Sequence, residues 1–270
     1  MDRRTRQCAA QALAAGERAV VVEVLEARGS APRAAGTRML ALPEQAVGTV
    51  GGGHLELKAL QTARAMLSAN ETSSRSEHFP LGPALGQCCG GTVTLGYQLL
   101  STDVLARWPE PAPLFRLQLY GAGHVGRAIA TLLATLDVEV DWIDERAQEF
   151  PDATTLGAPW PAHIRKLCVD AVEAEVRIAP AGAFYLVLTH QHELDLRIAE
   201  AVLRRGDFGF LGLIGSRTKR QRFIHRFEQL GIAEEAIARM TCPIGIEGIS
   251  GKQPEVLALA VVAQLLRAAT

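Results

Sequence analysis

Two adjacent cysteines, Cys88 and Cys89, stand between glycines in the segment GQCCGG, residues 86–91. A thiolate is the soft nucleophile and soft metal ligand of proteins, and a nearby helix N-terminus or arginine lowers its pKa. The usual alternative for cysteine, burial as a small apolar side chain, fits poorly because a glycine-flanked loop offers little core. The pattern therefore predicts an open loop that presents sulfur to a ligand.

Two other glycine-lined loops occur in the same half of the chain, GSAPRAAG at residues 29–36 and TVGGGHLE at residues 49–56. Consecutive glycines before a helix leave backbone N–H groups free for a phosphate, and an arginine offers a fork for planar anions. A tight strand-to-helix turn, with an acid favouring the helix dipole, is the alternative, but it does not require so many glycines in succession. The residues predicted to contact a ligand here are Arg33, Gly51, Gly52, Gly53, His54 and Glu56.

In the second half, LYGAGHVG places Gly121, Gly123 and Gly126 in G-x-G-x-x-G spacing between a predicted strand and a predicted helix. These glycines would allow a tight turn, close approach to a phosphate and close helix–sheet packing. Asp144 ends the next strand, about 20 residues on, where a ribose-binding acid would lie, and His124 falls within the loop. The context predicts a Rossmann-type fold. It leaves NAD(P) or another nucleotide open as a ligand, because the glycines alone explain a turn as well.

The segment THQHELD places His190, His192 and Asp195 between a predicted strand and a helix, where open α/β sheets bind ligands. Two histidines with a carboxylate are a metal-binding combination. A loop histidine pair whose acidic neighbours support the helix start is favoured over a metal site, but a ligand-facing role stays open.

The segment IGSRTKRQRFIHR follows the next predicted strand and is strongly basic. Ser216 is placed to cap a helix, and Arg217 lies at its N-terminus, an arrangement that suits a phosphate or pyrophosphate. A solvated basic helix face is the equal alternative.

These candidate residues fall on loops of two predicted domains. Three prolines in RWPEPAPLF, residues 107–115, indicate a stiff linker. We expect a small mixed α/β domain over residues 1–106 and a Rossmann-like parallel-sheet domain over residues 116–270. The fold class is therefore α/β.

The apolar patterns also locate the elements. In the first domain, strands are expected at 19–27, 37–42, 46–50, 75–79 and 92–100, and helices at about 3–15 and 51–67. In the second, strands are expected at 116–120, 138–144, 184–190 and 208–215, and helices at 123–136, 193–206, 216–231 and 252–268. This strand–helix alternation predicts a parallel sheet with helices on both faces.

The overall composition restricts the classes of function. Hydrophobic residues make up 48% of the 270 residues and charged residues 21%, with a net charge of −1, so neither a nucleic acid nor an anionic membrane is an expected partner. No secretory segment is recognised, and no apolar run approaches the roughly 20 residues of a membrane-spanning helix. The odd set of cysteines, Cys8, Cys88, Cys89, Cys168 and Cys242, favours free thiols in a reducing cytoplasm.

Seven segments together resemble the xanthine dehydrogenase accessory protein family, of the XdhC/CoxI type, and they cover nearly the whole chain. The paired motifs GGGHLE and GQCCGG are the specific ones, whereas the Rossmann glycines are common to many families. The segments are GSAPRAAGTRML, GTVGGGHLE, GPALGQCCGG, LYGAGHVGRAIA, THQHELD, IGSRTKR and PIGIEGISGKQPEVLALAVVAQLL.

The resemblance implies a maturation chaperone rather than a dehydrogenase. Members of this family bind molybdenum cofactor, support its sulfuration by a cysteine desulfurase, protect it, and help to insert it into apo xanthine dehydrogenase; they are homodimers. Their motifs match Gly51–Glu56 and the segment Gln87, Cys88, Cys89 and Gly90, so the resemblance implies cofactor contacts there. From thiolate chemistry we hypothesise that Cys88 or Cys89 lies near the metal.

Three other functions compete with this interpretation. An NAD(P)-dependent oxidoreductase would use Gly121 to Asp144 but would leave the first domain without a purpose. A metal-dependent hydrolase or nucleotidyltransferase would be built around His190, His192 and Asp195. A regulatory nucleotide-sensing module is the remaining alternative.

Overall fold

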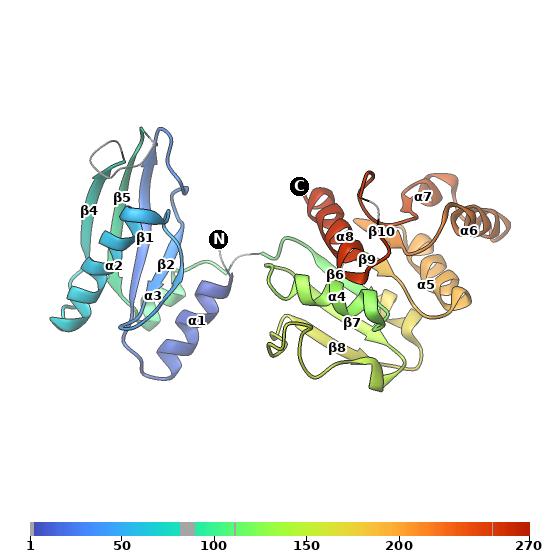
Figure 1. The fold of residues 1–270 in the computed structure, drawn as a ribbon, viewed down its shortest axis with the longest axis horizontal. Helices are drawn as coiled ribbons and strands as arrows, with labels where there is room; N and C mark the ends of the chain where they lie inside the picture. Colours follow the sequence, from blue (N-terminus) through green and yellow to red (C-terminus); the bar gives the residue numbers. More distant parts are fainter. Residues whose placement is uncertain (1–2, 82–89, 111, 250) are drawn as a thin grey trace. The chain divides into compact units, whose positions relative to one another are not determined.

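The computed structural model describes residues 3–81, 90–110, 112–249 and 251–270. The chain divides into two compact units, Met1–Ala112 and Pro113–Thr270. The division falls inside the proline-rich stretch at 107–115. Each unit is described by itself below, and Figure 1 labels most of the elements of both.

The N-terminal unit is built around a five-stranded sheet in the order β3-β2-β1-β5-β4, and each of its pairings is antiparallel. Side chains alternate between its two faces, because successive residues of a strand point in opposite directions. Val20, Val22 and Val24 pack with α2, whereas Val21 packs with α1. The bounds are α1 (Arg3–Ala14), β1 (Val20–Arg28), β2 (Arg38–Ala41), β3 (Ala46–Gly48), α2 (Gly53–Ser68), β4 (Arg75–Pro80), β5 (Thr92–Leu99) and α3 (Thr102–Ala106).

The C-terminal unit contains a six-stranded parallel sheet in the order β11-β10-β9-β6-β7-β8. Its strand order reverses between β6 and β9, the switch point at which open α/β sheets bind ligands. The strands are β6 (Arg116–Tyr120), β7 (Glu139–Asp144), β8 (Ile164–Cys168), β9 (Phe184–Val187), β10 (Phe210–Leu213) and β11 (Met240–Thr241). The helices are α4 (His124–Leu133), η2 (Ala147–Glu149), η3 (Val172–Ile178), α5 (His192–Arg205), α6 (Arg217–Gln229), α7 (Glu234–Ala238) and α8 (Pro254–Ala268).

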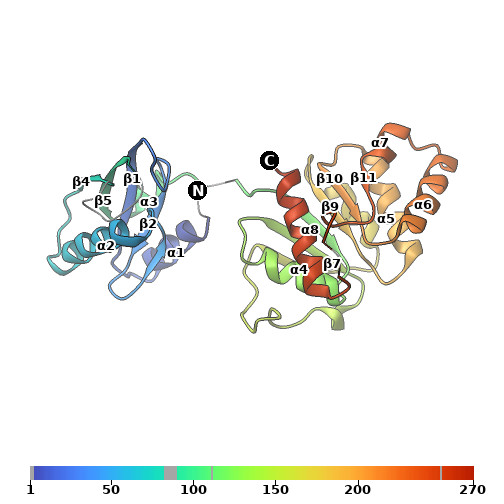
Figure 2. The ribbon, with the colours of Figure 1, turned by 45° about the horizontal axis from the view of Figure 1, so that its top comes forward.

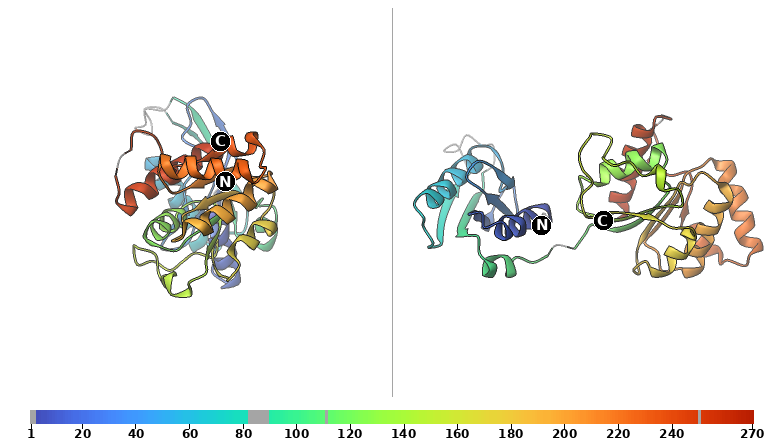
Figure 3. Two further views of the ribbon diagram at one scale, coloured as in Figure 1. Left: turned by 90° about the vertical axis from the view of Figure 1, so that its right-hand side faces the viewer. Right: turned by 90° about the horizontal axis from the view of Figure 1, so that it is seen from below.

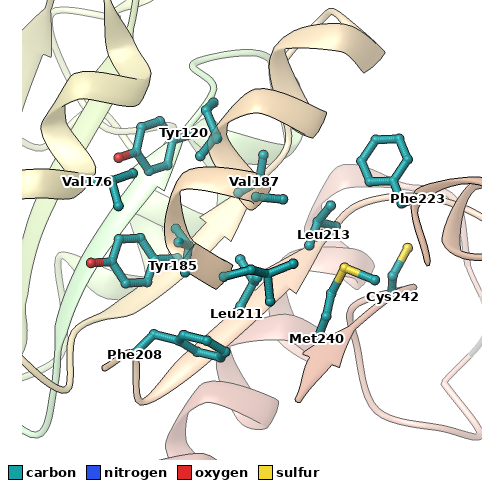
Figure 4. Packing of buried hydrophobic residues seen from close by; sticks show 14 of the residues in the cluster. Tyr120, Val176, Tyr185, Val187, Phe208, Leu211, Leu213, Phe223, Met240 and Cys242 are labelled. Carbon is teal, nitrogen blue, oxygen red and sulfur yellow. The ribbon is translucent and has the colours of Figure 1, made fainter. Parts of the chain in front are cut away.

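Helices cover both faces of this parallel sheet, as Figures 1, 2 and 3 show from different directions. One face packs against α4 and α8 around the buried Trp142. The other packs against α5, α6 and α7, and Figure 4 shows Val187, Leu211 and Leu213 in this second cluster with Phe223 of α6. The predicted fold class is confirmed: a mixed α/β chain with an antiparallel-sheet unit and a Rossmann-type unit.

Several predicted boundaries are wrong, each for a local reason. The strand predicted at 184–190 ends at Val187, because the Thr189 N–H turns away to the Asp195 carboxylate instead of a neighbouring strand. Strand β8 was not predicted; it lies at the sheet edge, and its half-exposed sequence lacks the continuous apolar run of a central parallel strand.

The C-terminal apolar segment forms a helix, as predicted, and that helix belongs to the core. Helix α8 packs its apolar face into the cluster around Trp142. Among the residues that the structure describes, no helix combines the length and apolar character that crossing a bilayer requires.

Candidate functional site

The triple-glycine turn before α2 adopts a backbone that only glycine tolerates. The φ angles of Gly51, Gly52 and Gly53 are 145°, 73° and 58°, all in the region that a side chain disfavours. The Glu56 carboxylate reaches back to accept hydrogen bonds from the Gly52 N–H, at 3.2 Å, and from the Thr49 hydroxyl. Glu56 therefore caps its own helix, as the alternative interpretation of this turn anticipated.

The capping leaves specific groups available for a ligand. The N–H groups of Gly53 and His54 find no acceptor among the described residues. His54 is exposed at the first turn of α2, where the helix dipole favours an anion.

The glycine loops of this unit pack directly on one another. A Cβ at Gly51 would lie 2.6 Å from Pro32 Cγ, and a Cβ at Gly91 would lie 2.4 Å from Arg28 O. A Cβ at Gly29 would lie 3.1 Å from Gly91 Cα. Three loops distant in sequence thus meet at one place, which we call the N-terminal loop cluster (residues 28–35, 49–56 and 90–92).

The cysteine-bearing segment starts and ends at this cluster. The Leu81 N–H donates to Gly91 O at 2.8 Å, so the described residues before and after this segment lie next to each other. The predicted site residues Gln87, Cys88 and Cys89 lie outside the described residues. Gly90 is exposed, and a Cβ there would meet no described atom within 4 Å.

Arg33 belongs to the N-terminal loop cluster and is exposed. It makes no salt bridge with a carboxylate in the part of the chain that the structure describes. Arg33 follows Pro32, which packs on Gly51, and a guanidinium is suited to a phosphate or another planar anion.

In the Rossmann unit, the glycine loop at Gly121–Gly123 lies at the switch point between β6 and β9. A Cβ at Gly121 would lie 2.4 Å from Leu188 O, and a Cβ at Gly126 would lie 2.1 Å from Gly121 O. Those two glycines are required by packing alone. Gly123 differs, because a Cβ there would meet nothing described within 4 Å, and its φ of −70° suits any residue. The backbone at Gly123 is therefore open beside the N-terminus of α4, where the helix dipole favours an anion.

Alanine substitutions should separate these two roles. We expect Gly121→Ala to lower the free energy of unfolding by about 1–3 kcal/mol, because Ala would clash with Leu188 at a φ of 118°. Gly123→Ala should lower it by less than about 1 kcal/mol, the cost of losing glycine as the N-cap of α4. Urea unfolding of both variants measures the difference, and equal destabilisation would contradict it.

The predicted ribose-binding acid, Asp144, is already fully engaged. It is only 5% exposed, and its carboxylate accepts hydrogen bonds from Ala122 N at 2.7 Å and from Arg146 Nε at 2.9 Å and Nη2 at 3.0 Å. Burial alone would raise the pKa of Asp144, but the bonds from Arg146 and from the Ala122 N–H outweigh it and hold that pKa below its usual value. Through its bond from the Ala122 N–H, Asp144 thus stabilises the glycine loop.

His190 and Glu145 face each other across the switch point. His190 Nε2 lies 3.6 Å from Glu145 Oε1, although one residue follows β9 and the other follows β7. His190 thus lies beside Glu145 at the carboxyl ends of the strands, and its ligand-facing role stays a prediction. His124, in the glycine loop, is exposed at the start of α4.

The third residue of the same motif, Asp195, has a different role. It is 1% exposed and accepts hydrogen bonds from Thr189 N at 3.0 Å, from Thr189 Oγ1 at 2.7 Å and from Lys219 Nζ at 2.5 Å. Lys219 Nζ also donates to Ile214 O at 2.8 Å. This buried ion pair joins the ends of β9 and β10 to α5 and α6.

Sequence reasoning missed Lys219 as a partner of Asp195. The basic segment offered several cations, and only the register of α6 turns this one inward, with 7% exposure. Ser216 caps α6 as predicted by accepting from the Lys219 N–H at 3.2 Å, and Arg217 is exposed at the helix N-terminus.

No group of histidine, cysteine or acidic side chains that could hold a metal occurs within the described ranges. His190 faces the switch point, His192 is exposed on α5, and Asp195 is buried against Lys219. The described cysteines Cys8, Cys168 and Cys242 are free thiols, and burial raises the pKa of Cys242.

Comparison with family models finds two matches along the chain. Residues 117–265 match the model described as the XdhC Rossmann domain. Residues 12–79 match the model described as the XdhC and CoxI family.

Two known proteins are similar over most of the chain. "Uncharacterized protein YqeB" of Escherichia coli strain K12 is 31% identical over an aligned length of 259 residues, and the alignment covers 92% of this chain and 43% of that protein. The chain thus spans less than half the length of this relative. A crystal structure described as a xanthine dehydrogenase from Bacillus halodurans aligns with a TM-score of 0.76 and 17% identity, over 99% of this chain and 96% of that one. This likeness shows the fold.

Proposed function

The chain belongs to the XdhC family, and this membership indicates a role in xanthine dehydrogenase maturation. From this premise we propose that it is a molybdenum cofactor-binding chaperone. It would hold the cofactor during sulfuration by a cysteine desulfurase and deliver it to apo xanthine dehydrogenase. We propose a homodimer as the working form. The proposal does not require turnover by the protein itself.

The observation that carries the proposal is the N-terminal loop cluster. Three loops pack through glycines at positions where a Cβ would clash, and the cysteine-bearing segment begins and ends beside them. The free N–H groups of Gly53 and His54 would hold an anionic phosphate, and Arg33 would pair with it.

The bound cofactor would supply a pterin-held molybdenum centre with an anionic tail. Cys88 or Cys89 would offer it a soft thiolate ligand, which molybdenum with sulfur ligands suits. Glu56 would not contact the tail, since its carboxylate stabilises the turn by capping Gly52. The residues of this unit therefore bind, orient and shield the cofactor.

A nucleotide in the Rossmann unit is a second candidate, favoured by the open space at Gly123. The described residues fit its phosphate but not the ribose contact of an NAD site, because the Asp144 carboxylate already accepts from Arg146 and Ala122. Titration with NADH, followed by its fluorescence, tests this candidate.

The deciding experiment is anaerobic purification of the chain from cells that make the cofactor, with molybdenum and pterin quantified together. We expect the two in equal amounts, and transfer of both to apo xanthine dehydrogenase with gain of activity. Purified protein that carries neither and activates nothing would exclude the proposed function.

A further inference from the structure

A groove of about 620 Å³ runs between the start of α5 and the length of α6, neighbouring helices in Figures 1 and 2. The proposed cofactor site lies in the other unit and does not use it. Its lining is largely basic around an apolar floor. Among the lining residues are His192, Glu193, Arg222, Phe223, His225 and Arg226.

Two arginines of this groove, Arg222 and Arg226, are available to an outside anion. Arg222 and Arg226 stand one helical turn apart on α6, so they face the same side. Within the described ranges, neither forms a salt bridge with a carboxylate; Arg226 Nη1 donates only to the neutral Gln229 Oε1, at 3.3 Å. Glu193 is the one acid among the lining residues described, so the positive charges dominate.

The floor of the groove is apolar and firmly held. Phe223 is 8% exposed and belongs to the buried cluster of Figure 4, and Leu196 packs against that cluster. Beneath them, Lys219 is neutralised by Asp195 and fixes α6 to α5. The groove is therefore preformed, which lowers the entropic cost of binding.

We propose that this groove docks an acidic segment of a protein partner, with carboxylates at Arg222 and Arg226 and an apolar side chain on Phe223. An apolar centre with a charged rim is the usual anatomy of a protein interface. Nucleic acid is disfavoured, because Glu193 and Glu228 flank a short basic stripe in a chain of net charge −1. That the partner is apo xanthine dehydrogenase rests on the proposed function. The binding of an acidic segment in the groove does not depend on that function.

The first test uses the full chain and a fluorescein-labelled peptide of about 15 residues, roughly four helical turns, that carries glutamates and leucines. Fluorescence anisotropy should show binding that weakens about ten-fold in Arg222→Glu and also weakens as salt shortens the Debye length below about 10 Å. Arg177→Glu is the matched control, since Arg177 is exposed in the same unit and outside the groove. It should bind like the parent protein.

Three results of this test would overturn the docking proposal. They are equal peptide affinity in the Arg222→Glu and Arg177→Glu proteins, equal affinity for a peptide with glutamine in place of glutamate, and tighter binding of a single-stranded RNA of the same net charge.

The second test measures co-purification with apo xanthine dehydrogenase. Arg222→Glu should retain bound cofactor and lose about ten-fold in affinity for the enzyme. Undiminished enzyme binding by Arg222→Glu would refute this docking site and leave the proposed function intact. Peptide binding that depends on Arg222, in a protein that never binds the enzyme, would support the groove and count against the proposed function.

Discussion

Replacing Lys219 by methionine is expected to lower the free energy of unfolding of the Rossmann unit by about 3–5 kcal/mol. Asp195 is 1% exposed, so the substitution would leave a carboxylate buried without its cation. Urea unfolding of the full chain in a Trp108→Phe background measures the effect. Trp142 and Trp160 then report this unit alone, because Trp108 belongs to the other one.

A double-mutant cycle shows whether the loss comes from the unpaired charge. Adding Asp195→Asn to Lys219→Met removes that charge, so the double variant should recover much of the lost stability. Lys252→Met is the surface control, since Lys252 is exposed in the same unit. It should change stability by less than about 0.5 kcal/mol. A Lys219→Met protein as stable as this control would disprove the role of the pair.

The second large effect concerns the adjacent thiols. We expect Cys88→Ala combined with Cys89→Ala to reduce the molybdenum and pterin retained after anaerobic purification by about ten-fold or more, because the soft ligand for the metal would be gone. Activation of apo xanthine dehydrogenase should fall in parallel.

The matched control replaces two thiols away from this segment. Cys8 lies on α1 and Cys168 ends β8, so Cys8→Ala with Cys168→Ala should retain the cofactor as the parent protein does. The single variants Cys88→Ala and Cys89→Ala would then show which sulfur matters. Unchanged retention together with unchanged activation in the first double variant would refute the thiol role.

The fold could be predicted because its signals are local. Two signals predicted the Rossmann-type unit: the glycine spacing at Gly121–Gly126, and the alternation of apolar runs with helical patterns. Both depend only on residues that are neighbours in sequence. Strand β8 was missed because its sequence, IRKLC, is partly exposed and mixes charged with apolar residues, so no apolar run marks it.

The sites were only partly predictable, because they depend on tertiary register. Asp195 and Lys219 meet only because α5 and α6 dock in one orientation on the sheet. The packing of Pro32 on Gly51, and of Gly29 on Gly91, likewise joins loops that no periodicity connects. Asp144 ends β7, where the glycine fingerprint predicts an acidic residue. Arg146, which pairs with its carboxylate, follows two residues later, and no sequence pattern predicts this pairing.

The hydrogen bond from Leu81 to Gly91 also bears on how relatives of this protein can diverge. It extends the pairing of β4 with β5 to the residues that flank the intervening stretch, so doubling the length of that stretch would cost only about 0.6 kcal/mol of loop-closure free energy. The stretch between β4 and β5 can therefore be exchanged between relatives, and its ligand preference changed, while the supporting sheet stays the same.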